Sequence, residues 1–260
     1  MDPVQVFVLA VLQGLVEFLP ISSSGHLIVV PALLGWPDQG LGFDIAVHVG
    51  TLAAVVIYFR REIVDLGRAL FHTDRREFKL AWSIIVATIP LGLAGLVFGD
   101  YVARALRSPA LIAGTTAGFG VVLWLADRYG RRDRDEHDLG WDQALLIGLS
   151  QALALIPGTS RSGITMTMGL AVGLNRAAAA RFSFLLAVPA IAAAGSWEVV
   201  EFASVATPVP WVTLAVAAAI AGVTAFLVIA AFLRLIERLG MLVFAVYRVL
   251  LSAGIVYTLL

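Results

Sequence analysis

The chain has 260 residues, of which 60% are hydrophobic and 14% are charged, and its formal net charge at pH 7 is zero. Soluble domains carry roughly a quarter charged residues, so this composition excludes a soluble globular protein and indicates an integral membrane protein. The balanced charge does not point to nucleic acid, and the absence of cysteine excludes disulfides, thiolate catalysis and cysteine-ligated zinc.

The first predicted element, at 3–34, is an apolar run that the sequence LPISSSGHL interrupts near its middle. Two half-length helices on either side of a Pro, Ser and Gly cluster are typical of a re-entrant hairpin, which enters and leaves the membrane on the same side. Three apolar runs follow at 43–59, 80–98 and 110–125. A membrane span needs about 17–25 residues, so each run is predicted to be a full crossing.

The second part of the chain shows the same order of elements. An apolar run at 143–174 is interrupted by IPGTSRSGIT, and three further runs follow at 182–195, 211–232 and 242–260. The predicted fold is therefore an all-α polytopic membrane protein. It has six full transmembrane helices and two re-entrant helical hairpins.

The two interrupted segments also resemble each other. A shift of 138 residues aligns QGLVEFLPISSSG with QALALIPGTSRSG and places Gln13 on Gln151. Because three spans follow each hairpin, the two copies are expected to have opposite orientations, as in an inverted-topology repeat. We expect one integral membrane domain, 1–260, composed of repeat halves 1–130 and 141–260.

The distribution of arginine and lysine predicts the orientation. Several lie in loop 60–79, in the loop after Leu125 and in the loop after Phe232, whereas 36–42 and 196–210 contain none. The positive-inside rule places the first three loops in the cytoplasm. We therefore expect a multi-pass protein of the cytoplasmic (inner) membrane with both termini on the external side.

The first hairpin carries polar groups at costly positions. Gln13 and Glu17 are four residues apart and share one helix face. Their oxygens suit a hard divalent cation, since Mg²⁺ binds through one or two carboxylates plus substrate phosphates. His26 follows the break and could serve as a general base near neutral pH. The structural alternatives are an interhelical hydrogen bond for Gln13, a protonated Glu17 and serines that only cap the helix.

The second hairpin supplies a positive charge, because Arg161 is its only Lys or Arg. Arginine is suited to bidentate phosphate binding. Ser160, Ser162 and Gly163 precede a predicted helix, whose first N–H groups form an anion site. If the two hairpins meet at the midplane, these groups favour a phosphate ester or pyrophosphate. The alternative role for Arg161 is a structural ion pair with Glu17.

The segments QGLVEFLPISSSGH at 13–26 and PGTSRSGIT at 157–165 carry a resemblance to a known family. They resemble the (E/Q)xxxE motif with its Ser-Ser-x-Gly-His segment, and the Pro-Gly-x-Ser-Arg-Ser-Gly signature, of undecaprenyl-pyrophosphate phosphatases of the BacA type. RFSFLLAVP at 181–189 is also similar to that family. The resemblance implies hydrolysis of undecaprenyl pyrophosphate to undecaprenyl phosphate and inorganic phosphate, which recycles the lipid carrier for cell-wall synthesis and is linked to bacitracin resistance.

The resemblance also implies which residues act. The family's functional Glu, Ser, His and Arg positions fall on Glu17, Ser23, His26 and Arg161, and the Mg²⁺ or Ca²⁺ that the family needs would be bound by Glu17 with Gln13. Two roles for Ser23 remain open, as nucleophile or as a phosphate-positioning group while water attacks. The groups expected to bind the substrate phosphates are Ser22, Ser24, Gly25, Ser160, Ser162, Gly163 and Thr165.

The alternative function is a lipid-phosphate flippase or a secondary transporter, since inverted repeats with re-entrant hairpins also build transporters. The set Glu17, Ser23 and His26 favours hydrolysis, because transport needs no nucleophile and base. The expected partners are the lipid pyrophosphate, at the external face, and membrane lipid, without nucleic acid; a homodimer is left open. Asp44 and His48 are as compatible with capping and packing as with a site.

Overall fold

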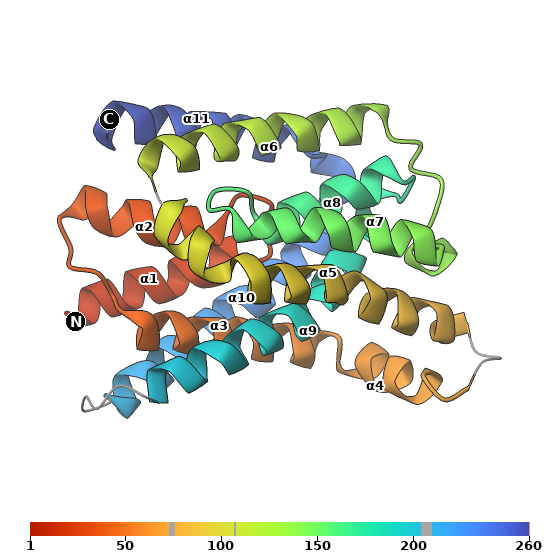
Figure 1. Ribbon diagram of the computed structural model, residues 1–260, viewed down its shortest axis with the longest axis horizontal. Helices are drawn as coiled ribbons and strands as arrows, with labels where there is room; N and C mark the ends of the chain where they lie inside the picture. Colours follow the sequence, from red (N-terminus) through yellow and green to blue (C-terminus); the bar gives the residue numbers. More distant parts are fainter. Residues whose placement is uncertain (73–75, 107, 204–209, 260) are drawn as a thin grey trace.

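The computed structural model describes residues 1–72, 76–106, 108–203 and 210–259. It is a bundle of helices, most of which lie along the long axis of the molecule (Figure 1). The helices are α1 (Pro3–Val16), α2 (Ser23–Leu34), α3 (Leu41–Tyr58), α4 (Arg60–Ala69), α5 (Arg76–Ala105), α6 (Pro109–Tyr129), α7 (Trp141–Ala152), α8 (Arg161–Ala171), α9 (Arg176–Ala203), α10 (Trp211–Leu239) and α11 (Leu242–Leu259), with 3-10 turns at Glu136–Asp138 and Leu153–Leu155. The described residues form no β-strand, so the predicted all-α class is confirmed.

Five helical segments are long and apolar enough to cross a membrane, and they coincide with five of the predicted spans. They are Leu41–Tyr58, Arg76–Gly99, Pro109–Tyr129, Arg176–Ser196 and Trp211–Leu239. The segment predicted at 242–260 forms a shorter apolar helix over Leu242–Thr258, and position 260 lies outside the described residues. The structure thus supports a polytopic membrane protein, while six full crossings remain a prediction.

Both predicted hairpin regions contain two short helices with a break between them. Residues 17–22 separate α1 from α2, and residues 153–160 separate α7 from α8. The second helix of each pair begins in the same way, because Ser22 (φ 73°) and Ser160 (φ 70°) are N-caps with positive φ. Non-glycine residues with positive φ are uncommon, so the aligned serines share an unusual backbone conformation and a capping role.

Close helix crossings hold the bundle together. A Cβ added to Gly14 of α1 would lie 2.6 Å from the Ala221 carbonyl oxygen of α10, and one added to Gly148 of α7 would lie 2.6 Å from the Ala87 oxygen of α5. At Gly50 of α3 an added Cβ would collide with the backbone of α10. Small residues let membrane helices approach closely, which explains glycine at these three positions.

The Gly50 crossing gives a stability prediction. Gly50→Ala forces α3 and α10 apart and is expected to lower the free energy of unfolding by about 1–3 kcal/mol, the usual cost of overpacking. A lower melting temperature of the purified protein in detergent would show this. Gly92→Ala is the matched control, since a Cβ there has no neighbour within 4 Å. Equal melting temperatures for the two variants would contradict the close crossing.

Ion pairs gather at one end of the molecule. Part of the predicted loop 60–79 forms helix α4, while 73–75 lie outside the described residues. Arg181 of α9 donates to Glu136 (2.6 Å) and to Glu62 of α4 (2.8 Å). Arg76 donates to Asp135 at 2.7 Å. Partial burial raises the pKa of the Asp135 carboxyl, but the hydrogen bond from the His137 backbone N–H and the Arg76 guanidinium outweigh it and hold that pKa below its usual value. We call this the basic end.

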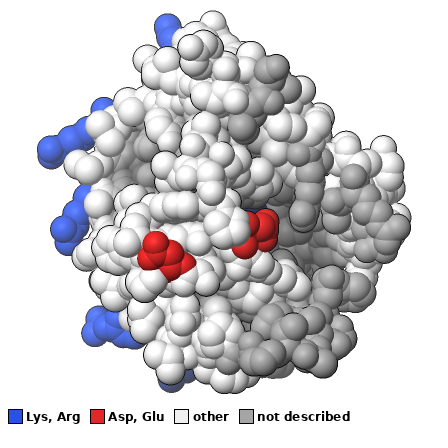
Figure 2. All heavy atoms as spheres, turned by 90° about the vertical axis from the view of Figure 1, so that its left-hand side faces the viewer, with Lys and Arg blue, Asp and Glu red and all other residues white. Residues whose placement is uncertain are grey.

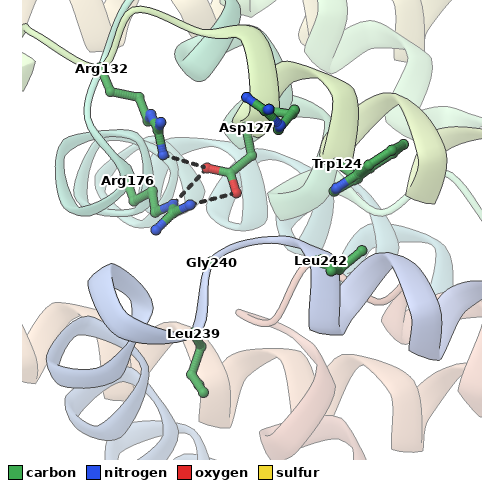
Figure 3. A pocket seen from close by; sticks show the side chains of 8 residues that line it. Trp124, Asp127, Arg132, Arg176, Leu239, Gly240 and Leu242 are labelled. Atoms are coloured by element: carbon green, nitrogen blue, oxygen red, sulfur yellow. Dashed lines mark hydrogen bonds and ion pairs between the residues drawn. The ribbon is translucent and has the colours of Figure 1, made fainter.

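The basic end also contains a small pocket of about 230 Å³ between α6, α9 and the link from α10 to α11 (Figure 3). Asp127 of α6 accepts two hydrogen bonds from Arg176 of α9, at 2.6 and 2.9 Å. Asp127 also accepts from the Met241 backbone N–H at 3.0 Å, and Arg132 lies 3.9 Å away. This bidentate pair, together with the Met241 N–H, fixes three elements to one another.

The opposite end of the molecule has a different surface. Both chain termini lie there (Figure 1). Figure 2 looks onto this end and shows two acidic groups near its centre, with the coloured Lys and Arg side chains only at its rim. The described part of the chain is thus polarised in charge along its long axis, as expected for a protein that obeys the positive-inside rule.

Candidate active site

The two hairpin breaks meet inside the bundle. Arg161, the first residue of α8, donates from Nη2 to Oε1 of Glu17 at 3.0 Å and from Nη1 to the Ser183 carbonyl at 3.3 Å. Ser162 donates from its hydroxyl to the carbonyl of Leu19 at 2.9 Å. The Glu17 side chain is 5% exposed and the Arg161 side chain 13%. The two costly charges, 144 residues apart in sequence, therefore form one buried pair.

Three further side chains surround the Glu17 carboxylate. Gln13 donates from Nε2 to Oε2 at 3.0 Å, one helical turn away on α1. Ser23, at the start of α2, lies near the same carboxylate. His48 of α3 places Nε2 3.8 Å from Oε2. The predicted nucleophile, the predicted cation ligands and the predicted phosphate-binding arginine are thus within reach of one another.

The sequence left open whether His48 belongs to the site, and the structure places it beside Glu17. Its Nδ1 lies 2.8 Å from the Asp44 carbonyl oxygen, one turn back on α3. A carbonyl can only accept, so Nδ1 carries a proton and Nε2 is the nitrogen that faces Glu17. An ionisable residue in an apolar span is by itself a signal of function. Only the packing of α3 against α1 shows that its neighbour is the Glu17 carboxylate.

The donor groups near Glu17 fit a divalent cation in one respect. The Oε1 atom of Gln13 is buried without a hydrogen-bond partner among the described residues, and it belongs to the side chain predicted to bind the cation with Glu17. No group of three or more His, Cys, Asp or Glu residues suited to a metal occurs in the described ranges. This set fits a hard cation that takes its remaining ligands from substrate phosphates and water, as Mg²⁺ commonly does.

His26 faces α11. Its Nδ1 lies 2.7 Å from the Ser22 carbonyl oxygen, and its Nε2 lies 2.6 Å from the Tyr247 hydroxyl. Since the carbonyl only accepts, Nδ1 donates, and in a neutral ring Nε2 then accepts from the Tyr247 hydroxyl, so that the basic nitrogen faces α11. The ring also stacks on Tyr247, with centroids 5.7 Å apart. Ser23 and His26 lie nearly one turn apart on α2, and within the described chain no hydrogen bond joins their side chains.

The predicted phosphate-binding groups gather at the beginnings of α2 and α8. In each copy the capping serine approaches the serine two residues later, with Oγ atoms 3.4 Å apart for Ser22 and Ser24 and 3.3 Å apart for Ser160 and Ser162. The caps accept from the backbone N–H groups of Gly25 and Gly163, at 3.3 and 3.1 Å respectively.

Thr165 lies one turn along α8. Its hydroxyl donates to the Arg161 carbonyl at 2.9 Å and lies 2.7 Å from the Ser183 hydroxyl. It therefore supports the backbone that carries Arg161. Contact of these groups with phosphate remains a prediction.

A family model described as "Bacitracin resistance protein BacA" matches residues 6–254. The chain belongs to the BacA family. Three similar proteins are "Undecaprenyl-diphosphatase 2" of Stutzerimonas stutzeri (strain A1501), 51% identical over 97% of both chains, and "Undecaprenyl-diphosphatase" of Nitrosococcus oceani and of Thioalkalivibrio sulfidiphilus (strain HL-EbGR7), 50% and 51% identical over 99% of both chains. The resemblance seen in the two motifs is thus confirmed as membership of the BacA family over nearly the whole length.

Proposed function

We propose that this BacA-family protein hydrolyses undecaprenyl pyrophosphate to undecaprenyl phosphate and inorganic phosphate. The observation that carries the proposal is the Glu17–Arg161 pair, formed where two helix beginnings and several hydroxyl groups converge. Two helix N-termini and an arginine suit a pyrophosphate. The similar proteins of other bacteria are named as undecaprenyl-diphosphatases, which supports the same substrate.

In this proposal Arg161 and the first N–H groups of α8 bind the terminal phosphoryl group and stabilise the charge that develops on it during transfer. The bond between the terminal phosphorus and the bridging oxygen breaks, and the lipid monophosphate leaves with that oxygen. The attacking oxygen comes from Ser23, through a phosphoseryl intermediate that water then hydrolyses, or directly from water. We infer that His26 accepts the proton of the attacking group, a step in which its Nε2 exchanges the Tyr247 hydroxyl for that group.

A divalent cation, Mg²⁺ or Ca²⁺, is part of the proposal. Glu17 and the free Oε1 of Gln13 would hold it. It would neutralise charge on the pyrophosphate oxygens. The Glu17 carboxylate would then face two positive charges, the Arg161 guanidinium and the cation.

The proposed architecture has six crossings and two re-entrant hairpins in an inverted repeat with halves 1–130 and 141–260. The matched caps at Ser22 and Ser160 support it. The helix contacts support it too, because α1 packs on α10 as α7 packs on α5, and each of these pairs joins a hairpin of one half to a span of the other. The halves therefore interlock.

The proposed orientation places the basic end in the cytoplasm of the producing bacterium. The ion pairs of Arg76, Arg176 and Arg181 lie there, in keeping with the positive-inside rule. Both termini lie at the other end and would be external (Figure 1). We place the protein in the cytoplasmic membrane with its site open to the external side.

The function is tested by phosphate release from farnesyl and undecaprenyl pyrophosphate, with purified protein in detergent. Release is expected with Mg²⁺ or Ca²⁺ and is expected to stop with a chelator, because two phosphates and Glu17 leave uncompensated negative charge without a cation. Release that the chelator leaves unchanged would contradict the cation. No release by folded protein with any cation would contradict hydrolysis and favour lipid-phosphate transport.

A further inference from the structure

Arg248 lies in the middle of the apolar helix α11, and its side chain is completely buried. Its guanidinium donates to backbone carbonyls from three segments of the chain. Nη1 donates to Pro20 at 3.2 Å, Nη2 donates to Gly158 at 2.9 Å and to Thr159 at 3.0 Å, and Nε donates to Thr116 at 2.8 Å. In the described part of the chain no carboxylate forms an ion pair with it. A buried charge without a counterion is costly, so this position needs a specific explanation.

The carbonyls that Arg248 binds belong to both hairpin breaks. Pro20 follows Glu17 by three residues, and Thr159 precedes Arg161 by two. A guanidinium is a rigid plane with five donors in fixed directions, so it can hold several chain segments at one spacing. Arg248 thus binds the backbone of both breaks at once, and it adds to the direct contacts of Ser162 with Leu19 and of Arg161 with Glu17.

We propose that Arg248 is a positioning residue for hydrolysis, which holds the two hairpin breaks at the separation at which Glu17 and Arg161 meet around the pyrophosphate. It is not a catalytic residue, because its side chain is completely buried and its guanidinium donates to backbone carbonyl groups. The role of Arg248 in positioning groups for this reaction rests on the function proposed above. The spacing that Arg248 imposes on the two breaks is independent of that function and can be measured without an activity assay.

Helix α6 supports this arrangement from the other side. Thr115 donates from its hydroxyl to the Pro157 carbonyl at 2.6 Å, so α6 also binds the second break. A Cβ added to Gly120 would lie 3.0 Å from Cβ and 3.4 Å from Nε of Arg248. A methyl group at Gly120 would therefore shift the Arg248 side chain without removing any charge.

The first test is Arg248→Lys. A lysine ammonium is a compact group with three donors and cannot reach three chain segments at once. Misplacement of reacting groups by about 1 Å can cost on the order of 10²-fold in rate, so kcat is expected to fall by about that factor while KM changes less. Arg176→Lys is the matched control, since it weakens the Asp127 pair at the basic end (Figure 3) and is expected to leave kcat unchanged.

The second test keeps Arg248 and displaces it. Gly120→Ala is expected to lower kcat less than Arg248→Lys does, with little change in KM. Gly114→Ala, on the same helix with open space around the added Cβ, is expected to behave as wild type. This pair keeps the proposal testable if Arg248→Lys does not fold. Equal kcat values for the two glycine variants, in folded proteins, would overturn it.

The third test measures the distance between the two hairpins directly. The chain has no cysteine, so spin labels can be placed on cysteines introduced at Ile28 of α2 and at Leu153 after α7, which are 39% and 42% exposed. A single narrow distance distribution is expected for the parent and for Arg176→Lys, and a broad one for Arg248→Lys. An unchanged distribution in Arg248→Lys would overturn the proposal even if hydrolysis were lost. A wild type that releases no phosphate would overturn the proposed function alone.

Discussion

Replacing Glu17 by Gln and Arg161 by Met together is expected to give a folded protein whose kcat for phosphate release is lower by at least about 10²-fold. Each single substitution leaves one charge buried without its partner, which typically costs about 3–5 kcal/mol of stability. The double variant removes both charges and should recover much of that loss. Activity should not recover, because the Arg161 guanidinium that binds phosphate and the Glu17 carboxylate are both absent. The loss of one transition-state donor alone costs about 10²–10³-fold.

This experiment separates the two readings of the pair. Melting temperature and kcat are measured for both single variants and for the double variant. If the double variant recovered stability and hydrolysed at the wild-type rate, Arg161 would be only a structural partner for Glu17. The double substitution Asp127→Asn with Arg176→Met is the matched control, because it removes another partly buried pair and is expected to keep wild-type kcat.

His26→Ala is expected to lower kcat by about 10²–10⁴-fold, the usual contribution of a general acid or base. The reason is that the neutral imidazole can take up the proton of the attacking group once Nε2 exchanges the Tyr247 hydroxyl for that group. The limb of the pH–rate profile on which activity rises as the imidazole loses its proton should also disappear. The measurement is kcat as a function of pH for the purified variant.

Tyr247→Phe provides the control for this prediction. It removes the hydroxyl group that occupies Nε2 and keeps the ring that stacks on His26. We expect a much smaller loss in kcat than for His26→Ala and a pH–rate profile that keeps the His26 limb. A His26→Ala variant that retained the wild-type profile would remove His26 from proton transfer.

The sequence predicts the hairpin breaks well, because Pro, Ser and Gly clusters in apolar runs leave few other interpretations. It also predicts that Glu17 meets Arg161, since two charges in apolar segments that align with each other are each costly to bury alone. The predicted loop at 60–79 was wrong for 60–69. Those residues form α4, in which polar and apolar residues alternate at helical spacing. The helix is polar overall, so a criterion based on apolar runs does not detect it.

The roles of His48 and Arg248 could not be read from the chain. Each sits in a segment that is predicted only as apolar, and each acquires its role from a helix that packs beside a distant break. Local patterns report which face of a helix is apolar, and they do not report which neighbour that helix meets. The contacts of α3 and α11 with the hairpins are tertiary information.

The Glu17–Arg161 pair has a consequence for how the protein is made. Ribosomes add about 5–20 residues per second, and 144 residues separate the two partners, so the carboxylate is synthesised roughly seven to thirty seconds before its guanidinium. During that interval the Glu17 carboxylate lacks its arginine partner, so it has to be hydrated or protonated. The Glu17–Arg161 pair can therefore form only after the second half of the chain has been synthesised.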